Sequence, residues 1–374
     1  MSKKEGEAVK SFRTLIALLL VFSLVFCTGC IQRLPQEEDA AAESMPAAPE
    51  QEPEPTETPA PETPEPVILY NQLTGLDTET DVSHERPYAV MINNIIYAQP
   101  QVGIGEADWI YEIEAEGGIT RMMALYTHIS DVPVLGSMRS LRPYYLSIAL
   151  SYDAIMLHAG RSYDAQKRLD EWHADHLDGV KDQTAYAAMF YRDPSRGAHG
   201  LEHTMFMKGD KVVPTVEKYG FRQQHEKGFR NGLSFSPDSV SLCTADASQV
   251  KVIFNSYKTM TMTYNAESGV YTGMQYGAPY TDGATGEEVP FSNILILFVD
   301  MSVYGEKNRI DAGVTGEGTG YYCTGGRYVP IKWTRAGNFD PYEYTTENGE
   351  PLTFTPGKTY CAVVPNGKGD VNFS

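Results

Sequence analysis

The pattern of hydrophobic and polar positions changes part-way along the chain. Between about residues 88 and 219, short apolar runs alternate with stretches in which apolar residues recur every three or four positions, the spacing of one helix face. After Phe229, serine and threonine become more frequent, and short segments of alternating apolar and polar residues predict β-strands. We therefore expect an α+β fold: an N-terminal mixed α/β domain with a strand–helix–strand unit, followed by a mainly antiparallel β domain.

Individual elements can be placed from the same pattern. Pro143 suits the first turn of a helix, where its missing N–H needs no partner, and Gly220 suits a helix end. Asn348-Gly349 between apolar segments predicts a hairpin turn. The expected helices begin near 143 and span 163–172 and 212–219; the expected strands are 88–92, 122–128, 154–158, 250–254, 260–264, 270–276, 294–299 and 359–364.

A turn rich in arginine lies between two of the expected strands, just before the helix that begins near Pro143. Arginines three residues apart share one face if they lie in a starting helix. Backbone N–H groups and guanidinium groups at a helix N-terminus form a natural site for an anion. We therefore predict an anion-binding site made of Arg121, Arg139, Ser140, Arg142 and His158.

Four acidic residues precede this turn, and their role depends on the local structure. On a helix, Asp108, Glu112 and Glu116 share one face and could serve acid–base chemistry. On a strand, Glu112, Glu114 and Glu116 share a face and become ion-pair partners for the arginines. Both interpretations stay open, although structural ion pairing is the more frequent use of such residues.

A loop near the end of the mixed region contains further candidates. Residues 193–200 read as a mobile loop beside the predicted pocket, with Arg196 and His199 as its candidate ligand-binding residues. His173, His176, His199 and His203 are spaced as H-x-x-H and H-x-x-x-H, which matches no established zinc motif. We therefore predict no metal site and no cofactor.

The first 30 residues resemble an export signal. A basic start is followed by the apolar segment Leu15–Phe26, which is of signal-peptide length and short for a membrane span. Thr28-Gly29-Cys30 at its end resembles a bacterial lipobox, so Cys30 is the predicted lipidation site and membrane anchor. Two acyl chains anchor a protein stably where one does so marginally. A plain secretory signal cut nearby is the alternative. Either way, the mature chain is expected outside the cytoplasm.

Residues 31–66 are predicted to form a disordered Glu/Pro tether. They contain ten acidic residues, nine prolines and one arginine, so they bury too little apolar surface to fold. The whole chain has a formal net charge of −19, which argues against nucleic acid as a partner. Any anion site must therefore be a local feature of an acidic protein.

The remaining chain is long enough for two domains, which we place at residues 67–230 and 231–374. Only Cys243, Cys323 and Cys361 follow the signal segment, and their spacings fit no zinc motif. Three buried free thiols are the simplest expectation, with one disulfide as the alternative. An exported chain so poor in cysteine depends on its hydrophobic core for stability.

Several motifs occur together in a specific order. RPYAVMINN, EGGITR, GSMRSLRPYYLSIALSYDAI and HAGRS resemble the YerB-like lipoproteins of Gram-positive bacteria. The resemblance runs from about residue 73 to 365 and implies two domains of unknown function behind a lipoprotein signal. Members of that family often carry Pro-His-Asn near residues 198–200, of which only His199 matches here.

Two functions are compatible with these features. The first is a non-catalytic lipoprotein of the cell envelope that binds an anionic envelope component or a protein partner. The second is an envelope hydrolase or transferase that uses Asp108, Glu112 or Glu116 as acid–base groups, with Arg139 and Arg142 holding a phosphate or carboxylate. No G-x-S-x-G, zincin or transpeptidase signature is present, which favours the first.

Overall fold

The computed structural model describes residues 69–305 and 307–374. These residues belong to one compact unit, Glu65–Ser374. The predicted signal peptide, Cys30 and the acidic tether lie outside the described residues. Within the part of the chain that is described, no helix is both long enough and apolar enough to cross a membrane.

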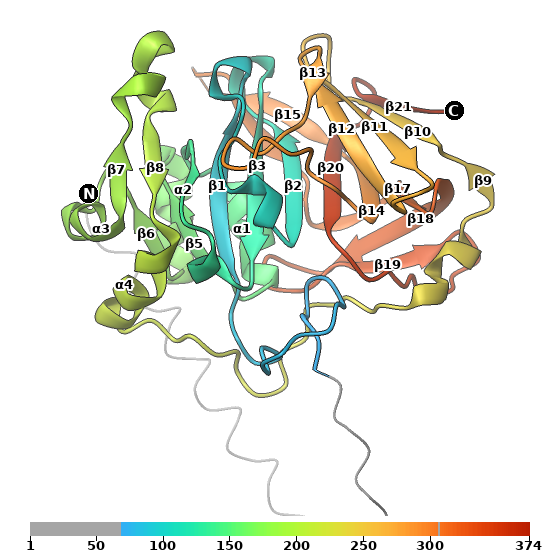
Figure 1. The fold of residues 1–374 in the computed structure, drawn as a ribbon, viewed down its shortest axis with the longest axis horizontal. Helices are drawn as coiled ribbons and strands as arrows, with labels where there is room; N and C mark the ends of the chain where they lie inside the picture. Colours follow the sequence, from blue (N-terminus) through green and yellow to red (C-terminus); the bar gives the residue numbers. More distant parts are fainter. Residues whose placement is uncertain (1–68, 306) are drawn as a thin grey trace, which may run out of the picture. The chain divides into compact units, whose positions relative to one another are not determined.

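One long mixed sheet of 11 strands organises the structure (Figure 1). Six strands of this sheet point the same way: β6, β5, β1, β2, β20 and β14. In spatial order the strands are β19 (Glu343–Thr346), β18 (Arg327–Arg335), β17 (Gly316–Thr324), β14 (Asn293–Val299), β20 (Thr359–Pro365), β2 (Trp109–Glu114), β3 (Thr120–Tyr126), β1 (Tyr88–Asn94), β5 (Ile155–His158) and β6 (His176–Asp178), with β9 (Ala245–Asp246) beside β18.

The two faces of this sheet contact different layers. Along β1, Val90 and Ile92 enter one hydrophobic core while Ala89 and Met91 enter the other, as the period of two in a strand requires. One core receives side chains from α1 (Pro143–Ser151) and α2 (Tyr163–Trp172). The other receives α3 (Gln183–Met189), α4 (Val212–Tyr219) and a five-stranded antiparallel sheet: β13 (Ala278–Pro279), β12 (Val270–Gln275), β11 (Thr259–Asn265), β10 (Gln249–Ile253) and β21 (Asp370–Phe373).

Smaller elements complete the fold. One three-stranded sheet contains β4 (Leu135–Gly136), β8 (Met205–Met207) and β7 (Phe190–Arg192), and a two-stranded ribbon contains β15 (Met301–Tyr304) and β16 (Arg309–Ala312). The 3-10 helices are η1 (Ile96–Ala98), η2 (Ile104–Glu106), η3 (Glu116–Gly118), η4 (Ile129–Asp131), η5 (Pro194–His199), η6 (Leu201–His203), η7 (Gly209–Lys211) and η8 (Pro237–Leu242).

The expected α+β class is confirmed, and most of the expected elements are present. The helices at 163–172 and 212–219 match α2 and α4, and Gly220 ends α4 in the left-handed region with φ 70°. The Asn348-Gly349 turn is closed by a hydrogen bond from the Gly349 N–H to the Thr346 carbonyl at 2.9 Å. The three cysteines are free and buried, so the expectation of thiols rather than a disulfide is confirmed.

The predicted strand–helix–strand unit needs one correction. The strands on either side of α1, β3 and β5, are not neighbours, because β1 lies between them. β1 is antiparallel to β3 and parallel to β5. The parallel crossover therefore joins β1 to β5. An apolar run identifies a strand, but it carries no information on which neighbour that strand selects.

Strands from the two predicted domains meet in the middle of the long sheet. β2 pairs in parallel with β20, with Trp109 opposite Thr359 and Ile113 opposite Val363. Residues more than 240 positions apart are thus neighbours. The domain boundary near residue 230 stays a prediction; in the structure, the two halves are continuous through one sheet.

Candidate anion-binding site

Most of the candidate residues lie at one edge of the long sheet. β1, β2 and β5 end at this edge, which is uppermost in Figure 1 together with the tip of the hairpin formed by β7 and β8. Asn93 and Asn94 end β1, Glu116 follows β2, and Arg121 lies at the start of the antiparallel β3. In open α/β sheets, the carboxyl ends of strands are where ligands usually bind.

The arginine turn reaches this edge as extended backbone. The Arg139 N–H donates to the Met91 carbonyl at 2.9 Å, and the Ala159 N–H donates to the Arg139 carbonyl at 3.1 Å, so the turn is inserted between β1 and the end of β5. Arg142 is the residue before α1, with φ −125° and ψ 155°. The prediction that Arg139 and Arg142 share a helical face was wrong, because the residue before a proline disfavours helical backbone.

The guanidinium groups of Arg142 and Arg121 converge on one carboxylate. Arg142 holds Glu116 with two bonds, from Nε to Oε1 at 2.5 Å and from Nη2 to Oε2 at 2.8 Å. Arg121 adds a contact from Nη2 to Oε2 at 3.4 Å and donates from Nη1 to the Ser140 carbonyl at 2.6 Å. Burial would raise the pKa of Glu116, but Arg142 and Arg121 lower it overall.

Positive charge exceeds negative charge at this point. The pKa of Arg121 falls to about 10, because burial and the charges of Arg142 and Arg139 oppose its protonated form. Arg139 makes one contact, a long one from Nη1 to the Glu202 carbonyl at 3.5 Å. Among the described residues, the buried Nε atoms of Arg121 and Arg139 have no hydrogen-bond partner. Two guanidinium groups therefore share the carboxylate of Glu116, and the third, that of Arg139, lies near the charge of Glu202.

The hairpin between β7 and β8 extends this cluster. Asn93 Nδ2 donates to Nδ1 of His203 at 2.9 Å, and the ring of His199 stacks on Tyr97 with 4.0 Å between centroids. Arg196 fastens the hairpin by donating from Nη2 to the carbonyls of Ala98 and Pro100, each at 2.8 Å. We call the resulting series the basic row: Arg121, Arg142, Arg139, His203 and His199.

Two of the predicted anion ligands point elsewhere. Ser140 donates its hydroxyl to the Ala159 carbonyl at 3.0 Å. His158 is fully buried, with Nδ1 bonded to the Gly160 carbonyl at 2.9 Å and Nε2 to His176 Nδ1 at 3.1 Å. Since a carbonyl only accepts, the His158 proton is on Nδ1, and Nε2 accepts from His176. His158 thus belongs to a separate cluster with Asp178.

The three acids lie on or beside β2, so the helical arrangement was wrong. They have separate partners. Asp108 accepts from Asn71 Nδ2 at 3.0 Å and from the Thr127 N–H at 2.7 Å, and burial raises its pKa. The expected pairing with arginine applies to Glu116; among the described residues it does not extend to Glu112, which pairs with Lys258, or to Glu114.

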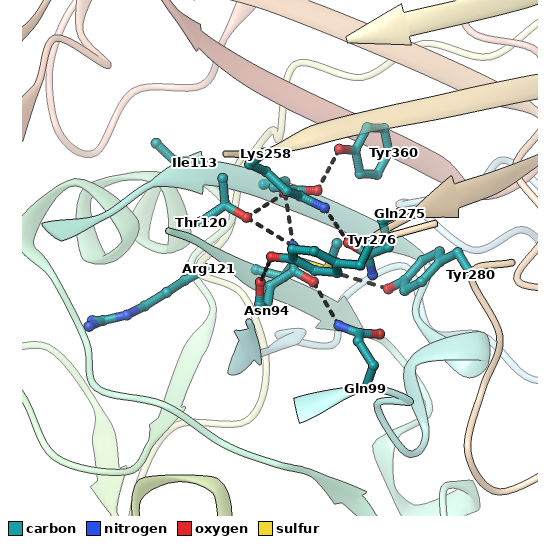
Figure 2. A network of polar contacts seen from close by, with 12 residues as sticks. Asn94, Gln99, Ile113, Thr120, Arg121, Lys258, Gln275, Tyr276, Tyr280 and Tyr360 are labelled. Atoms are coloured by element: carbon teal, nitrogen blue, oxygen red, sulfur yellow. Dashed lines mark hydrogen bonds and ion pairs between the residues drawn. The ribbon is translucent and has the colours of Figure 1, made fainter. Parts of the chain in front are cut away.

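Glu112 lies in a buried polar network between the two sheets (Figure 2). Its carboxylate accepts from Tyr360 at 2.6 Å, from Thr120 at 2.5 Å and from Asn94 at 2.8 Å. Lys258 Nζ lies 3.2 Å from Glu112 Oε1, and the two side chains are 1% and 0% exposed. Burial lowers the pKa of Lys258, while Glu112 opposes that shift.

Lys258 connects the second half of the chain to this network. Its ammonium donates to Gln275 Oε1 and lies 4.7 Å from the centre of the Tyr276 ring. Tyr276 donates its hydroxyl to the Asn94 carbonyl at 2.6 Å. Figure 2 shows the Arg121 side chain pointing away from this group, so the network and the basic row use opposite sides of β3. Sequence reasoning missed Lys258, a single lysine in a polar turn.

Comparison with known proteins identifies the family to which the chain belongs. Two family models match the chain: the N-terminal domain of a protein of unknown function (DUF3048) over residues 73–222, and the DUF3048 C-terminal domain over residues 250–361. The chain belongs to the DUF3048 family. YerB, a candidate lipoprotein of Bacillus subtilis (strain 168), is 30% identical over 311 residues, which cover 80% of this chain and 87% of YerB. The crystal structure of YerB matches with a TM-score of 0.70 at 27% identity, covering 81% of this chain and 99% of that chain.

The expected resemblance to YerB-like proteins is therefore confirmed. The basic row lies within the region matched by the DUF3048 N-terminal domain, and Lys258 lies within the C-terminal one. The Glu112–Lys258 pair thus joins the two DUF3048 regions. Among the described residues, no group of three or more His, Cys, Asp or Glu side chains is placed to hold a metal ion.

Proposed function

We propose that this protein is an extracytoplasmic lipoprotein, anchored in the cell membrane through Cys30, that binds an anionic group of an envelope component or partner protein at the basic row. The observation that carries the binding proposal is the ratio of charges: three guanidinium groups lie near one another, two of them bind Glu116, and Glu202 is the second carboxylate whose charge acts on Arg139. Guanidinium groups fit carboxylate and phosphate oxygens in pairs. An added anion would relieve the repulsion among the arginines.

The acidity of the rest of the chain makes this local excess informative. With a formal net charge of −19, most arginines have carboxylates nearby, as Arg86 does in its contacts with Asp153 and Asp175. Arg139 differs, because its one hydrogen bond is a long one to the backbone carbonyl of Glu202, whose carboxylate acts on it by charge without forming an ion pair. Burying a charge without a full set of partners costs free energy. That the protein keeps Arg139 in this unfavourable environment supports a role for it in binding.

The alternative function, an envelope hydrolase or transferase, receives less support. Acid–base catalysis needs a carboxyl group within hydrogen-bond reach of a substrate. Glu112 is fully buried with four partners, and Glu116 is held by arginine. Asp108 is buried at the other end of β2, with both oxygens bonded. This arrangement suits structure and binding more than proton transfer.

Replacing Cys30 with alanine is expected to release the protein from membranes or leave it unprocessed. The reason is that the thiol of Cys30 follows a Thr-Gly pair at the end of an apolar segment, and YerB is itself named as a candidate lipoprotein. Membrane fractionation and lipid labelling check this, with Cys27→Ala as the matched control. Unchanged labelling of Cys30→Ala would exclude this residue as the anchor.

Replacing Arg142 with alanine is expected to weaken binding of inorganic phosphate by about 1.5–3 kcal/mol, roughly ten- to a hundredfold, the range for a charge-assisted hydrogen bond. Stability should fall by about 1 kcal/mol or less, since Glu116 is 20% exposed and keeps its contact with Arg121. Calorimetric titration of the full-length chain in detergent, with thermal unfolding alongside, measures both.

Arg168→Ala provides the control, because it removes a guanidinium group from an exposed pair with Glu171 on α2. It should change neither phosphate binding nor stability measurably. A loss of more than about 3 kcal/mol of stability in Arg142→Ala, together with no phosphate binding by the wild type, would show that the arginines are structural and that the binding proposal is wrong.

A further inference from the structure

We infer that the basic row contains two anion subsites, that Glu116 occupies one of them as an internal substitute for the ligand, and that the ligand is a phosphodiester-linked polyol polymer. This inference rests on the proposed function and specifies its ligand. Arg142 forms the first subsite, and Arg139 forms the second.

The first subsite already shows how an anion is held. Nε and Nη2 of Arg142 each donate to one oxygen of Glu116, which is the paired geometry that guanidinium groups also use for phosphate. Glu116 is 20% exposed and Arg142 is 14% exposed, so solvent reaches both partners. The Glu116 carboxylate is therefore in a position that a ligand anion could take over.

The segment that carries Glu116 has room for this exchange. Gly117 and Gly118 follow it with φ 79° and 74°, and a Cβ on Gly117 would meet no atom within 4 Å. The backbone around them stays anchored, because the Ala115 N–H donates to Ile119 and Asn255 donates to Gly118. The open space beside Gly117 leaves room for the Glu116 side chain to move while the backbone stays in place.

The second subsite is short of partners. Arg139 has an unpaired buried Nε and a single long contact at 3.5 Å. Burial lowers the pKa of Arg139; the charge of Glu202 opposes that shift and the charge of Arg142 adds to it. Two residues of extended chain separate Arg139 from Arg142, which places their Cα atoms roughly 10 Å apart. Two guanidinium groups spaced along extended backbone fit successive charges of a polymer better than one small anion.

Apolar surface at the end of the row suits the uncharged part of such a polymer. Tyr97 is 50% exposed and Ile96 is 49% exposed, and both belong to η1 beside His199. The carbon chain between two phosphates can pack on these side chains while the phosphates bind arginine. A polyol phosphate combines regularly spaced charge with apolar C–H surface, as the row requires.

The test compares Glu116→Gln and Arg139→Gln with wild type in the full-length chain, using a short poly(glycerol phosphate) oligomer and monomeric glycerol phosphate as probes. Glu116→Gln is expected to bind both probes about tenfold more tightly, because it removes the competing carboxylate. Arg139→Gln should weaken binding of the oligomer about tenfold and of the monomer much less, because only the oligomer can occupy both subsites at once. Thermal unfolding confirms that each variant is folded.

Each of the following outcomes would refute one part of the inference. Wild type that binds oligomer and monomer equally would refute the two subsites. If Glu116→Gln folds normally but binds the probes no more tightly than wild type, the inference that Glu116 takes the place of the ligand is wrong. Single-stranded DNA binding more tightly than the oligomer would refute the polyol ligand. Failure of the proposed function looks different, because neither wild type nor any variant would then bind phosphate or either probe.

Discussion

Replacing Lys258 with methionine is expected to lower the free energy of unfolding by about 3–5 kcal/mol, the cost of leaving one member of a buried ion pair alone. Lys258 and Glu112 are 1% and 0% exposed and lie 3.2 Å apart. Without the ammonium group, Glu112 keeps hydrogen bonds from Tyr360, Thr120 and Asn94, but its charge remains buried without an opposite charge. Urea denaturation at neutral pH measures the change.

Two further variants make the result specific. Glu112→Gln combined with Lys258→Met should recover most of the loss, because the double variant buries no unpaired charge. Lys251→Met removes an exposed lysine from β10 of the same sheet and should change stability by about 0.5 kcal/mol or less. A loss below about 1 kcal/mol in Lys258→Met would mean that the pair does not hold the two halves together.

The stability of the wild type is expected to fall by roughly 2–3 kcal/mol between pH 7 and pH 4 through His158 alone. Burial lowers the pKa of His158 from 6.5 to about 3, and the charges of His176 and Arg161 act in the same direction while Asp178 opposes them. The folded protein therefore keeps this imidazole neutral. Below pH 6.5, His158 binds a second proton in the unfolded chain, whereas in the folded protein it stays neutral.

The contribution of His158 is thus fully present above the unfolded pKa of 6.5 and is lost as the pH falls toward about 3. His158→Gln isolates it, since glutamine can donate to the Gly160 carbonyl and accept from His176 but does not titrate. The difference in unfolding free energy between wild type and variant, measured by urea denaturation at several pH values, should shrink with acidification. A difference that does not change with pH would contradict this prediction.

Local features of the sequence determined much of the fold. Alternating and helical hydrophobic patterns located β1, β3, β5, α2, α4 and several strands of the second half, because burial imposes a period of two or 3.6 residues on any chain. The glycine after α4 and the Asn348-Gly349 turn followed from backbone chemistry at single positions. The order of the arginine, glycine and asparagine motifs was sufficient to indicate the DUF3048 family.

The candidate site was predicted in part. Arg121, Arg139 and Arg142 could be grouped from sequence because they lie close together along the chain and few other basic residues surround them. Their pairing with Glu116 was one of two interpretations, since the same acids share a face on a helix or on a strand. The pairing depended on the acidic segment forming a strand, with Glu116 after it. The local pattern did not distinguish this strand from a helix.

Only the tertiary structure decided the remaining contacts. The insertion of β1 between β3 and β5, the pairing of β2 with β20 and the approach of Lys258 to Glu112 all join segments whose separation in sequence is unrelated to their separation in space. The sequence by itself indicated many of the buried apolar positions and where several elements begin and end, because those patterns depend on neighbours along the chain. Partners across the sheet depend on which strands pair, and that choice is made by the packing of the whole core.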